Sequence, residues 1–222
     1  IGYQGIFGAA ALGDLGLGAS THLLHQEDLG LGRINSLKTG VLYADSVTTV
    51  SPTYAREIAT PQYGMGLESV IRARGDAVVG ILNGVDYEEW SPETDVHLPA
   101  HFDARNLAGK ERLKRHLHEQ FGLSYARERP LFGLISRLTV QKGIDLLFEA
   151  LPRALGARDM SFVALGSGEA QYEDFFQRLT RLYPGRVAFY RGYNEELAHL
   201  IEGASDMFLM PSLYEPCGLN QM

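Results

Sequence analysis

Arg137 and Lys142 are two cationic side chains placed where they can act on one anion. They lie in the run Ser136-Arg137-Leu138-Thr139-Val140-Gln141-Lys142-Gly143, between an apolar segment at 131–135 and a helical pattern from 144. A helix N-terminus presents unpaired N–H groups and a partial positive charge, so two cations there are unfavourable in isolation. An anion between them, such as a diphosphate, reverses that sign. Two solvated surface cations are the alternative interpretation.

Glu215 is the acidic candidate. It precedes Pro216-Cys217-Gly218-Leu219-Asn220, just after an apolar segment at 207–210. A carboxylate at the end of a strand can accept hydrogen bonds from sugar hydroxyls, and free N–H groups around Gly218 can bind phosphate. The alternative is an acid favoured by the dipole of a following helix. Cys217 is predicted to pack in the turn, because no His lies near it in the sequence to activate it.

Other kinds of site lack their motifs. Gly166-Ser167-Gly168-Glu169 follows a predicted strand without the spacing of a dinucleotide fingerprint, and there is no Gly-x4-Gly-Lys-Ser/Thr loop. Three histidine pairs have no accompanying cysteines or carboxylates of the zinc type: His22/His25, His97/His101 and His116/His118. No Asp-x-Asp occurs. We therefore expect no bound metal, so that a diphosphate would have to be neutralised by Arg, Lys and a helix end.

The composition limits the possible functions. The 222 residues carry 20 basic and 27 acidic side chains, a net charge of −7, which disfavours non-specific binding to nucleic acid or anionic membranes. No run reaches the ~18 apolar residues of a membrane span. A single cysteine excludes a disulfide scaffold. We expect a reduced, soluble, cytoplasmic α/β protein, and a chain running from Ile1 to Met222 without an initiating Met suggests an internal piece.

The elements that position these residues alternate in the second half. Strands are predicted at 131–135, 162–165, 187–190 and 207–210, and helices at 144–155, 172–182 and 197–201. Strands that alternate with helices indicate a parallel sheet of right-handed βαβ units. In such sheets ligands bind beyond the carboxyl ends of the strands. The loops of interest begin at Ser136, Gly166, Arg191 and Ser212.

The first half is less regular. We expect strands at 47–50 and 77–82, the second ending in a turn at Asn83-Gly84, and short helices around 34–42, 54–58 and 67–71. A longer helix carries Leu113, Leu117 and Phe121 on one face and ends at Gly122. The polar stretch 123–130 then separates two α/β patterns, which predicts two domains, 1–125 and 126–222.

Taken in order, the motifs resemble those of bacterial glycogen synthases and the related starch synthases. The similar segments in the second half are 136–143, Leu165-Gly166-Ser167-Gly168 and Glu215-Pro216-Cys217-Gly218-Leu219. In the first half they are Tyr3-Gln4-Gly5, Lys38-Thr39-Gly40, Tyr43-Ala44-Asp45, 49–55 and 81–86. The resemblance covers essentially the whole chain.

The resemblance implies a GT-B architecture, in which two Rossmann-like domains face a cleft. Residues 1–125 would be the C-terminal part of the acceptor-side domain, and 126–222 the first half of the nucleotide-sugar-binding domain. The implied activity is retaining, metal-independent transfer of glucose from ADP-glucose to the non-reducing end of an α-1,4-glucan, without a cofactor. The implied partners are ADP-glucose and glycogen, with no nucleic acid and no membrane, and the sequence leaves the oligomeric state open.

Residue roles follow from the resemblance, position by position. Arg137 and Lys142 would neutralise the donor diphosphate, and Glu215 would contact the transferred glucose. The remaining donor-site positions are Gly166, Tyr193 beside the adenine, Cys217, Gly218 and Leu219 around the sugar, and Asn220 near a phosphate. Asn83, from the other domain, would face the sugar or the acceptor.

Two alternatives remain open from the residues alone. One is a related retaining GT-B enzyme that uses UDP-glucose, and the other is a non-catalytic module that binds a sugar nucleotide. The family's N-terminal Lys-containing glycine loop and a donor-side His have no counterpart in this sequence. We therefore expect the 222-residue chain alone to be inactive.

Overall fold

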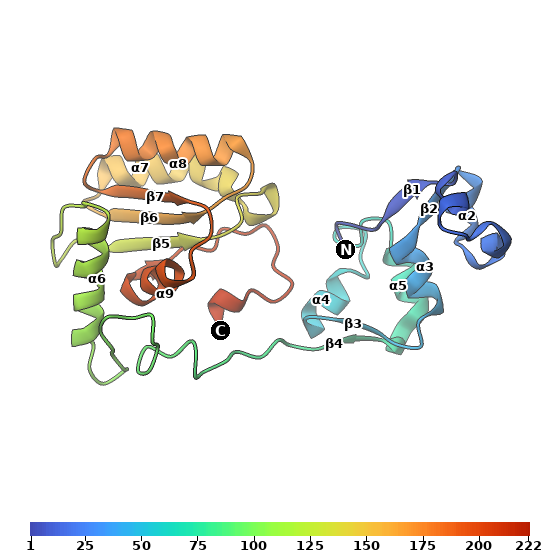
Figure 1. The fold of residues 1–222 in the computed structure, drawn as a ribbon, viewed down its shortest axis with the longest axis horizontal. Coiled ribbons are helices and arrows are strands. Elements are labelled where there is room, and N and C mark those ends of the chain that lie inside the picture. Colours follow the sequence, from blue (N-terminus) through green and yellow to red (C-terminus); the bar gives the residue numbers. More distant parts are fainter. The chain divides into compact units, whose positions relative to one another are not determined.

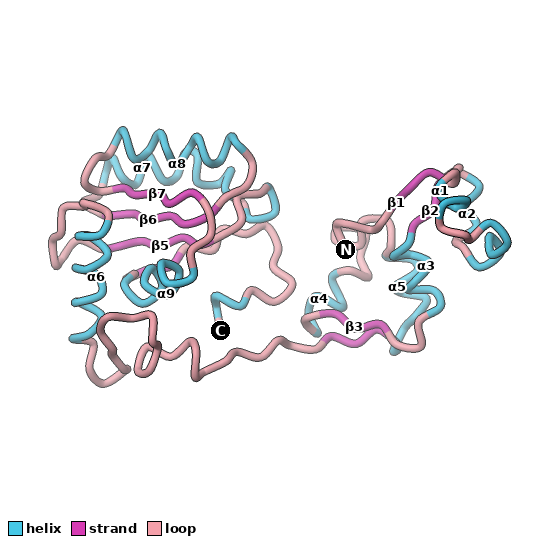
Figure 2. Tube along the Cα trace, viewed as in Figure 1, coloured by secondary structure: helices cyan, strands magenta, loops and turns pink.

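The computed structural model describes all 222 residues, which form two compact units (Figures 1 and 2). One unit contains residues 1–84 together with 216–222, and the other contains residues 85–215. No helix is both long enough and apolar enough to cross a membrane.

The second unit is built on a four-stranded parallel sheet, as the alternating pattern predicted. Its strands are β5 (Leu131–Ile135), β6 (Ser161–Gly166), β7 (Val187–Arg191) and β8 (Met207–Phe208), in the order β7-β6-β5-β8. Ile135 pairs with Leu165, and Gly166 pairs with Arg191, so the carboxyl ends of β5, β6 and β7 share one edge. β8 is shorter than the predicted 207–210, although the Leu209 N–H still donates to the Gly133 carbonyl at 2.8 Å.

Helices cover both faces of this sheet (Figure 1). α7 (Leu147–Ala157) and α8 (Ala170–Leu182) pack on one face, and α6 (Ala108–Gln120) and α9 (Glu195–Ala204) on the other. Two short 3-10 turns, η3 (Val140–Lys142) and η4 (Ile144–Leu146), precede α7. Alternate residues of β6 enter opposite cores, Phe162 with α7 and α8, Val163 with α6 and α9. Every residue of β6 is buried, which explains the apolar run that follows Ser161 in this strand.

Buried polar contacts fasten α6 to the sheet. Lys114 Nζ lies 2.8 Å from Asp206 Oδ2, and the Leu131 N–H donates to the same oxygen at 2.7 Å. His118 is fully buried, with Nε2 3.1 Å from Ser161 Oγ. Desolvation lowers the pKa of His118 below its ordinary value, and the charges of Lys114 and Arg129 act in the same direction. The ring is therefore neutral in the folded protein at neutral pH.

The predicted domain boundary lies inside this unit. α6 packs on α9, and the compact units separate between Gly84 and Val85. Residues 85–125 therefore fold with the second sheet through side-chain packing. A division into domains at 125/126 stays a prediction.

The first unit contains small sheets and short helices. β1 (Ile6–Gly8) pairs antiparallel with β2 (Arg33–Asn35), and β3 (Val47–Thr49) pairs parallel with β4 (Val78–Gly80). The helices are α1 (Ala11–Asp14), α2 (Gln26–Gly30), α3 (Ser36–Tyr43), α4 (Pro52–Glu57) and α5 (Glu68–Arg74), with 3-10 turns η1 (Gly18–Leu23) and η2 (Gly75–Ala77).

The predicted helix around 34–42 starts later than expected. Ile34 lies in β2, because Asn35 is the N-cap of α3 and its side chain accepts from the Lys38 N–H at 2.9 Å.

The buried carboxylate of Asp28 contacts the first turn of α3. Asp28 binds Arg33 Nε at 2.9 Å and Lys38 Nζ at 3.2 Å. Burial acts to raise the pKa of Asp28, but the bonds and charges of Arg33 and Lys38 outweigh it, and the pKa lies below its ordinary value.

Candidate functional site

Three loops meet at the carboxyl edge of the second sheet. The Leu138 N–H donates to the Ser167 carbonyl at 2.9 Å, and the Leu138 carbonyl accepts from the Glu169 N–H at 2.8 Å. The Gly192 N–H donates to the Gly166 carbonyl at 3.0 Å. The loops that follow β5, β6 and β7 therefore form one connected backbone surface.

Glycines allow these backbones to approach closely. A Cβ on Gly166 would lie 2.0 Å from the Ser136 carbonyl oxygen, and a Cβ on Gly168 would lie 2.2 Å from that of Leu138. Gly143 has a φ of +65°, and a Cβ there would lie 2.0 Å from the Pro211 carbonyl oxygen. Gly166 thus has a packing reason for its identity. Its predicted role in donor binding stays a prediction.

Lys142 and Glu215 form an ion pair. The two residues are 73 positions apart in the sequence, and their side chains are only 21% and 17% exposed. Ser212 Oγ also donates to Glu215 Oε1, at 2.7 Å. The Leu213 N–H donates to the Gln141 carbonyl at 2.9 Å and so fastens the two segments together. The structure therefore brings together two predicted site residues, Lys142 and Glu215, that belong to separate sequence motifs.

Arg137 lies in the same loop as Lys142 but is unpaired. Its side chain is exposed and makes no hydrogen bond or ion pair with the protein. Thr139 Oγ1, two residues further on, is buried without a hydrogen-bond partner. An oxyanion can bind in this loop, because three suitable groups lie within six residues. They are the free guanidinium of Arg137, the half-buried ammonium of Lys142 and the unsatisfied hydroxyl of Thr139.

Glu173 is a residue of this site that the sequence did not single out. It is buried on α8, and its Oε1 accepts from the Gly168 N–H at 3.0 Å. Its Oε2 lies 2.7 Å from Arg191 Nε. One carboxylate thus links the loop after β6 to the last residue of β7. In the sequence it looks like an ordinary acid in the first turn of a helix, and only its position five residues after Gly168 hints at more.

Tyr193 lies in the loop after β7. Its side chain is 77% exposed, and the next residue, Asn194, caps α9 by accepting from the Leu197 N–H at 2.9 Å. The exposed ring stands directly before a fixed helix start, where a flat ligand can stack on it. The predicted contact with adenine stays a prediction.

The segment after Glu215 begins with a turn. Only η5 (Leu219–Gln221) forms there, after Gly218 with a φ of +72°. Cys217 lies in the turn, where its carbonyl accepts from Gln221 Nε2 at 2.6 Å. Lys142 and Ser212 hold the Glu215 carboxylate, and the alternative interpretation, an acid favoured by the dipole of a following helix, stays untested.

The predicted donor positions in this turn are accessible to different degrees. Leu219 and Asn220 are exposed, and Cys217 and Gly218 are partly buried. Their roles stay predictions.

Asn83 belongs to the first unit. It lies in an irregular segment, 81–86, because β4 ends at Gly80 and no turn forms at Asn83-Gly84. The expected strand to residue 82 is therefore too long. Asn83 is partly buried, and its assignment to the sugar or acceptor side stays a prediction.

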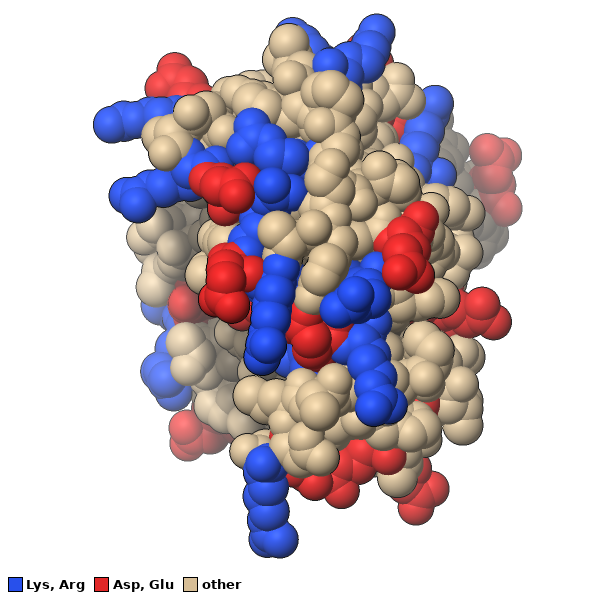
Figure 3. Space-filling view, turned by 90° about the vertical axis from the view of Figure 1, so that its left-hand side faces the viewer, with Lys and Arg blue, Asp and Glu red and all other residues tan.

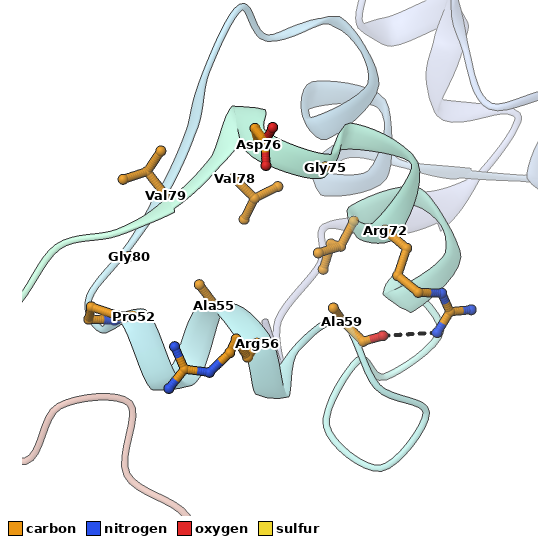
Figure 4. Close-up of a pocket in the computed structure, with 11 residues that line it drawn as sticks. Pro52, Ala55, Arg56, Ala59, Arg72, Gly75, Asp76, Val78, Val79 and Gly80 are labelled. Carbon is orange, nitrogen blue, oxygen red and sulfur yellow. Dashed lines mark hydrogen bonds between the residues drawn. The ribbon is translucent and has the colours of Figure 1, made fainter.

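The first unit also contains an open hollow of about 500 Å³ between α4, α5 and β4 (Figure 4). Arg56 and Arg72 line it, and Arg72 Nη1 donates to the Ala59 carbonyl at 2.9 Å. None of the predicted site residues lines this hollow. It does not support the predicted chemistry.

The surface seen from the side of α6 mixes both signs of charge. Lys and Arg side chains lie beside Asp and Glu side chains across this face (Figure 3). A continuous basic surface, which nucleic acid would require, is not present on this face.

Comparison with known proteins identifies the class. Residues 118–222 match the family model of glycosyl transferases group 1, and residues 1–73 match that of the starch synthase catalytic domain. The region of the parallel sheet and most of the first unit thus each match a glycosyltransferase model.

Individual relatives narrow the class further than the two family models do. The chain is 49% identical over 222 residues to the glycogen synthase of Anaeromyxobacter dehalogenans, and 48% identical to that of Myxococcus xanthus. Both alignments cover 100% of this chain and 46% of the relative, so the chain spans about half the length of the curated relatives it matches. The solved catalytic domain of starch synthase IV from Arabidopsis thaliana, bound to ADP and acarbose, matches with a TM-score of 0.90 and 40% identity. That match covers 99% of this chain and 46% of the other.

The chain therefore belongs to the glycogen and starch synthase family of glycosyltransferases. Its fold class is GT-B, as the resemblance implied.

Proposed function

We propose that the protein containing this chain transfers glucose from ADP-glucose to the non-reducing end of an α-1,4-glucan, with retention of configuration. The observation that carries the proposal is the Lys142–Glu215 pair, which lies in the same loop system as the unpaired Arg137. Support comes from the relatives named glycogen synthase and from the starch synthase solved with ADP and acarbose.

The reaction breaks the bond between the anomeric carbon and the diphosphate oxygen. A new bond forms between that carbon and the acceptor hydroxyl oxygen, whose proton is released. The departing diphosphate gains negative charge during this step. Arg137 and Lys142 stabilise that charge, which is the electrostatic work that fixed cations perform best. We propose that no metal ion is needed at the diphosphate.

Glu215 orients the transferred glucose. Both of its hydrogen-bonded partners, Lys142 Nζ and Ser212 Oγ, bind Oε1, so Oε2 is available to a sugar hydroxyl. Lys142 lies between this carboxylate and the diphosphate that it neutralises. The ion pair therefore connects the residue that binds the diphosphate, Lys142, with the residue that binds the glucose, Glu215.

The other roles complete the donor site. Tyr193 packs against the adenine, and Asn83 contributes to the sugar or acceptor side. Backbone groups at Gly166, Cys217, Gly218 and Leu219, with Asn220 near a phosphate, surround the sugar nucleotide.

The deciding experiment supplies the full-length protein with a glucan primer and either ADP-glucose or UDP-glucose. We expect labelled glucose to enter the glucan faster from ADP-glucose. Faster incorporation from UDP-glucose would favour the related UDP-glucose enzymes. Binding of either nucleotide sugar without incorporation would favour a non-catalytic module.

A further inference from the structure

His199 forms a polar cluster on α9 that the sugar-nucleotide site does not use. The side chain is fully buried, and Nδ1 lies 2.6 Å from Asp95 Oδ2. The Trp90 ring stacks on the imidazole, with centroids 3.7 Å apart and planes 14° from parallel. A proton on Nδ1 makes the Asp95 contact a hydrogen bond, which fixes the ring and leaves a lone pair on Nε2.

That lone pair has no partner. Nε2 of His199 is buried and makes no hydrogen bond, and its nearest ionic neighbour, Glu195 Oε1, is 3.8 Å away. Glu89 completes a group in which one ligand atom from each of the three residues lies within 4.8 Å of the others. A bare lone pair facing two carboxylates is unfavourable, and a cation between them removes the conflict.

Two elements position these three side chains. Glu195 and His199 are four residues apart on α9, so they lie on the same helix face, and the Asn194 cap fixes where that helix begins. Glu89 comes from the segment that Trp90 and Asp95 hold against His199. A proton on Nε2 in place of a metal would find its carboxylate beyond hydrogen-bond distance.

We propose that Glu89, Glu195 and His199 bind a divalent first-row transition-metal ion of the zinc type. One imidazole nitrogen and two carboxylates suit zinc, whereas calcium and magnesium prefer oxygen ligands alone. Asp95 is then the carboxylate that orients the metal-bound histidine. The charge of the ion balances that of the two ligating carboxylates. The metal fastens the segment around residues 89–95 to α9 and takes no part in glucosyl transfer.

The test measures metal binding by the full-length protein after dialysis against a chelator. We expect one equivalent of Zn²⁺ by calorimetry, visible d–d absorption when Co²⁺ is supplied instead, and a higher unfolding temperature with Zn²⁺. Glu89→Gln and Glu195→Gln should each weaken Zn²⁺ binding by at least the roughly tenfold that loss of an outer-shell partner costs. Glu196→Gln is the matched control, because this neighbouring acid lies outside the cluster and should leave the affinity unchanged.

Both glutamate variants keep the buried Asp95–His199–Trp90 contacts, so they are expected to fold. Absence of saturable binding by Zn²⁺ and Co²⁺ would overturn the proposal. Equal affinity in the Glu89→Gln/Glu195→Gln double variant and the Glu196→Gln control would also overturn it. The readout is binding rather than transfer, so its failure is distinct from a failure of the proposed activity.

Discussion

Lys142 and Glu215 form an ion pair whose two members are proposed to act on two ends of one ligand, the sugar nucleotide. In the structure they neutralise each other, and Ser212 holds the carboxylate in place. Arg137 has no such partner and is exposed. The arrangement leaves one cation free for the donor and a second held close to where the diphosphate is proposed to bind.

Replacing Arg137 or Lys142 with alanine should therefore impair transfer in the full-length protein. We expect kcat to fall roughly 10²–10³-fold in each variant, the loss typical of removing one fixed donor to a developing anion. Steady-state kinetics with ADP-glucose and a glucan primer measures this. Arg178→Ala, at an exposed position on α8, is the control and should retain normal turnover. Near-normal rates for Arg137→Ala and Lys142→Ala would identify both residues as surface cations.

Glu215→Gln separates sugar orientation from nucleotide binding. The amide keeps the shape of the side chain but loses the charge that attracts Lys142. We expect kcat to fall far more than the affinity for ADP, because the carboxylate is proposed to contact glucose rather than the nucleotide. Titration calorimetry with ADP, alongside kcat, tests the split. Loss of ADP binding with unchanged turnover at saturating donor would contradict the assigned role.

At the scale of elements, α8 supports the loop after β6 and the end of β7 through Glu173. Its carboxylate binds the Gly168 N–H and Arg191, although Arg191 is 65% exposed and that half of the contact is screened by solvent. The hydrogen bond from the Gly168 N–H to Glu173 Oε1 is better protected from solvent. We therefore propose that Glu173 positions the loop after β6 relative to the end of β7.

We expect Glu173→Ala to raise the KM for ADP-glucose several-fold with a smaller effect on kcat. The loop after β6 and the end of β7 lose their shared anchor, so the donor must order them when it binds. Donor kinetics measures the KM and kcat separately, and Asp174→Asn, at the exposed neighbouring position, serves as the control. A fall in kcat with no change in KM would point to a different role. Rescue by Glu173→Gln is expected only in part, because the amide restores the Gly168 bond without the charge.

His118 makes the attachment of α6 sensitive to pH. Its pKa is lowered on folding, so the unfolded chain takes up this proton first as the pH falls through about 6.5. The free energy of unfolding is therefore fully retained above that pH and decreases below it, until the folded protein is also protonated. Urea unfolding at pH 7 and pH 5 measures the difference. We expect His118→Gln to reduce this pH dependence and His116→Gln, an exposed neighbour on α6, to leave it unchanged.

For the whole molecule, we propose that Arg137 and Lys142 neutralise the diphosphate without a metal ion. We expect the full-length protein to keep its turnover in EDTA. A strict requirement for Mg²⁺ or Mn²⁺ would contradict the proposed neutralisation by Arg137 and Lys142. EDTA could also remove an ion from the Glu89–Glu195–His199 cluster. A loss of activity caused at that cluster should appear in the Glu195→Gln variant without EDTA, whereas a metal requirement at the diphosphate should not.

Much of the second unit could be predicted from the sequence. Short apolar runs at 131–135 and 162–165 alternate with helical patterns, and strands of this kind form parallel sheets whose carboxyl ends meet. That rule alone placed Arg137, Gly166 and Tyr193 along one edge. The first unit was harder, because strands of three residues such as β1 and β2 carry too little periodicity to be recognised.

Tertiary structure decided which distant side chains meet. The Lys142–Glu215 pair joins residues 73 positions apart, and the Glu173 carboxylate binds the loop before α8 and the end of β7. The group on α9 is not evident from the histidine pairs of the sequence, because it joins Glu195, four residues before His199, to Glu89, more than a hundred positions away. Local patterns determine elements through backbone geometry and burial. Pairing between distant charged groups depends on the path of the folded chain, which no local pattern encodes.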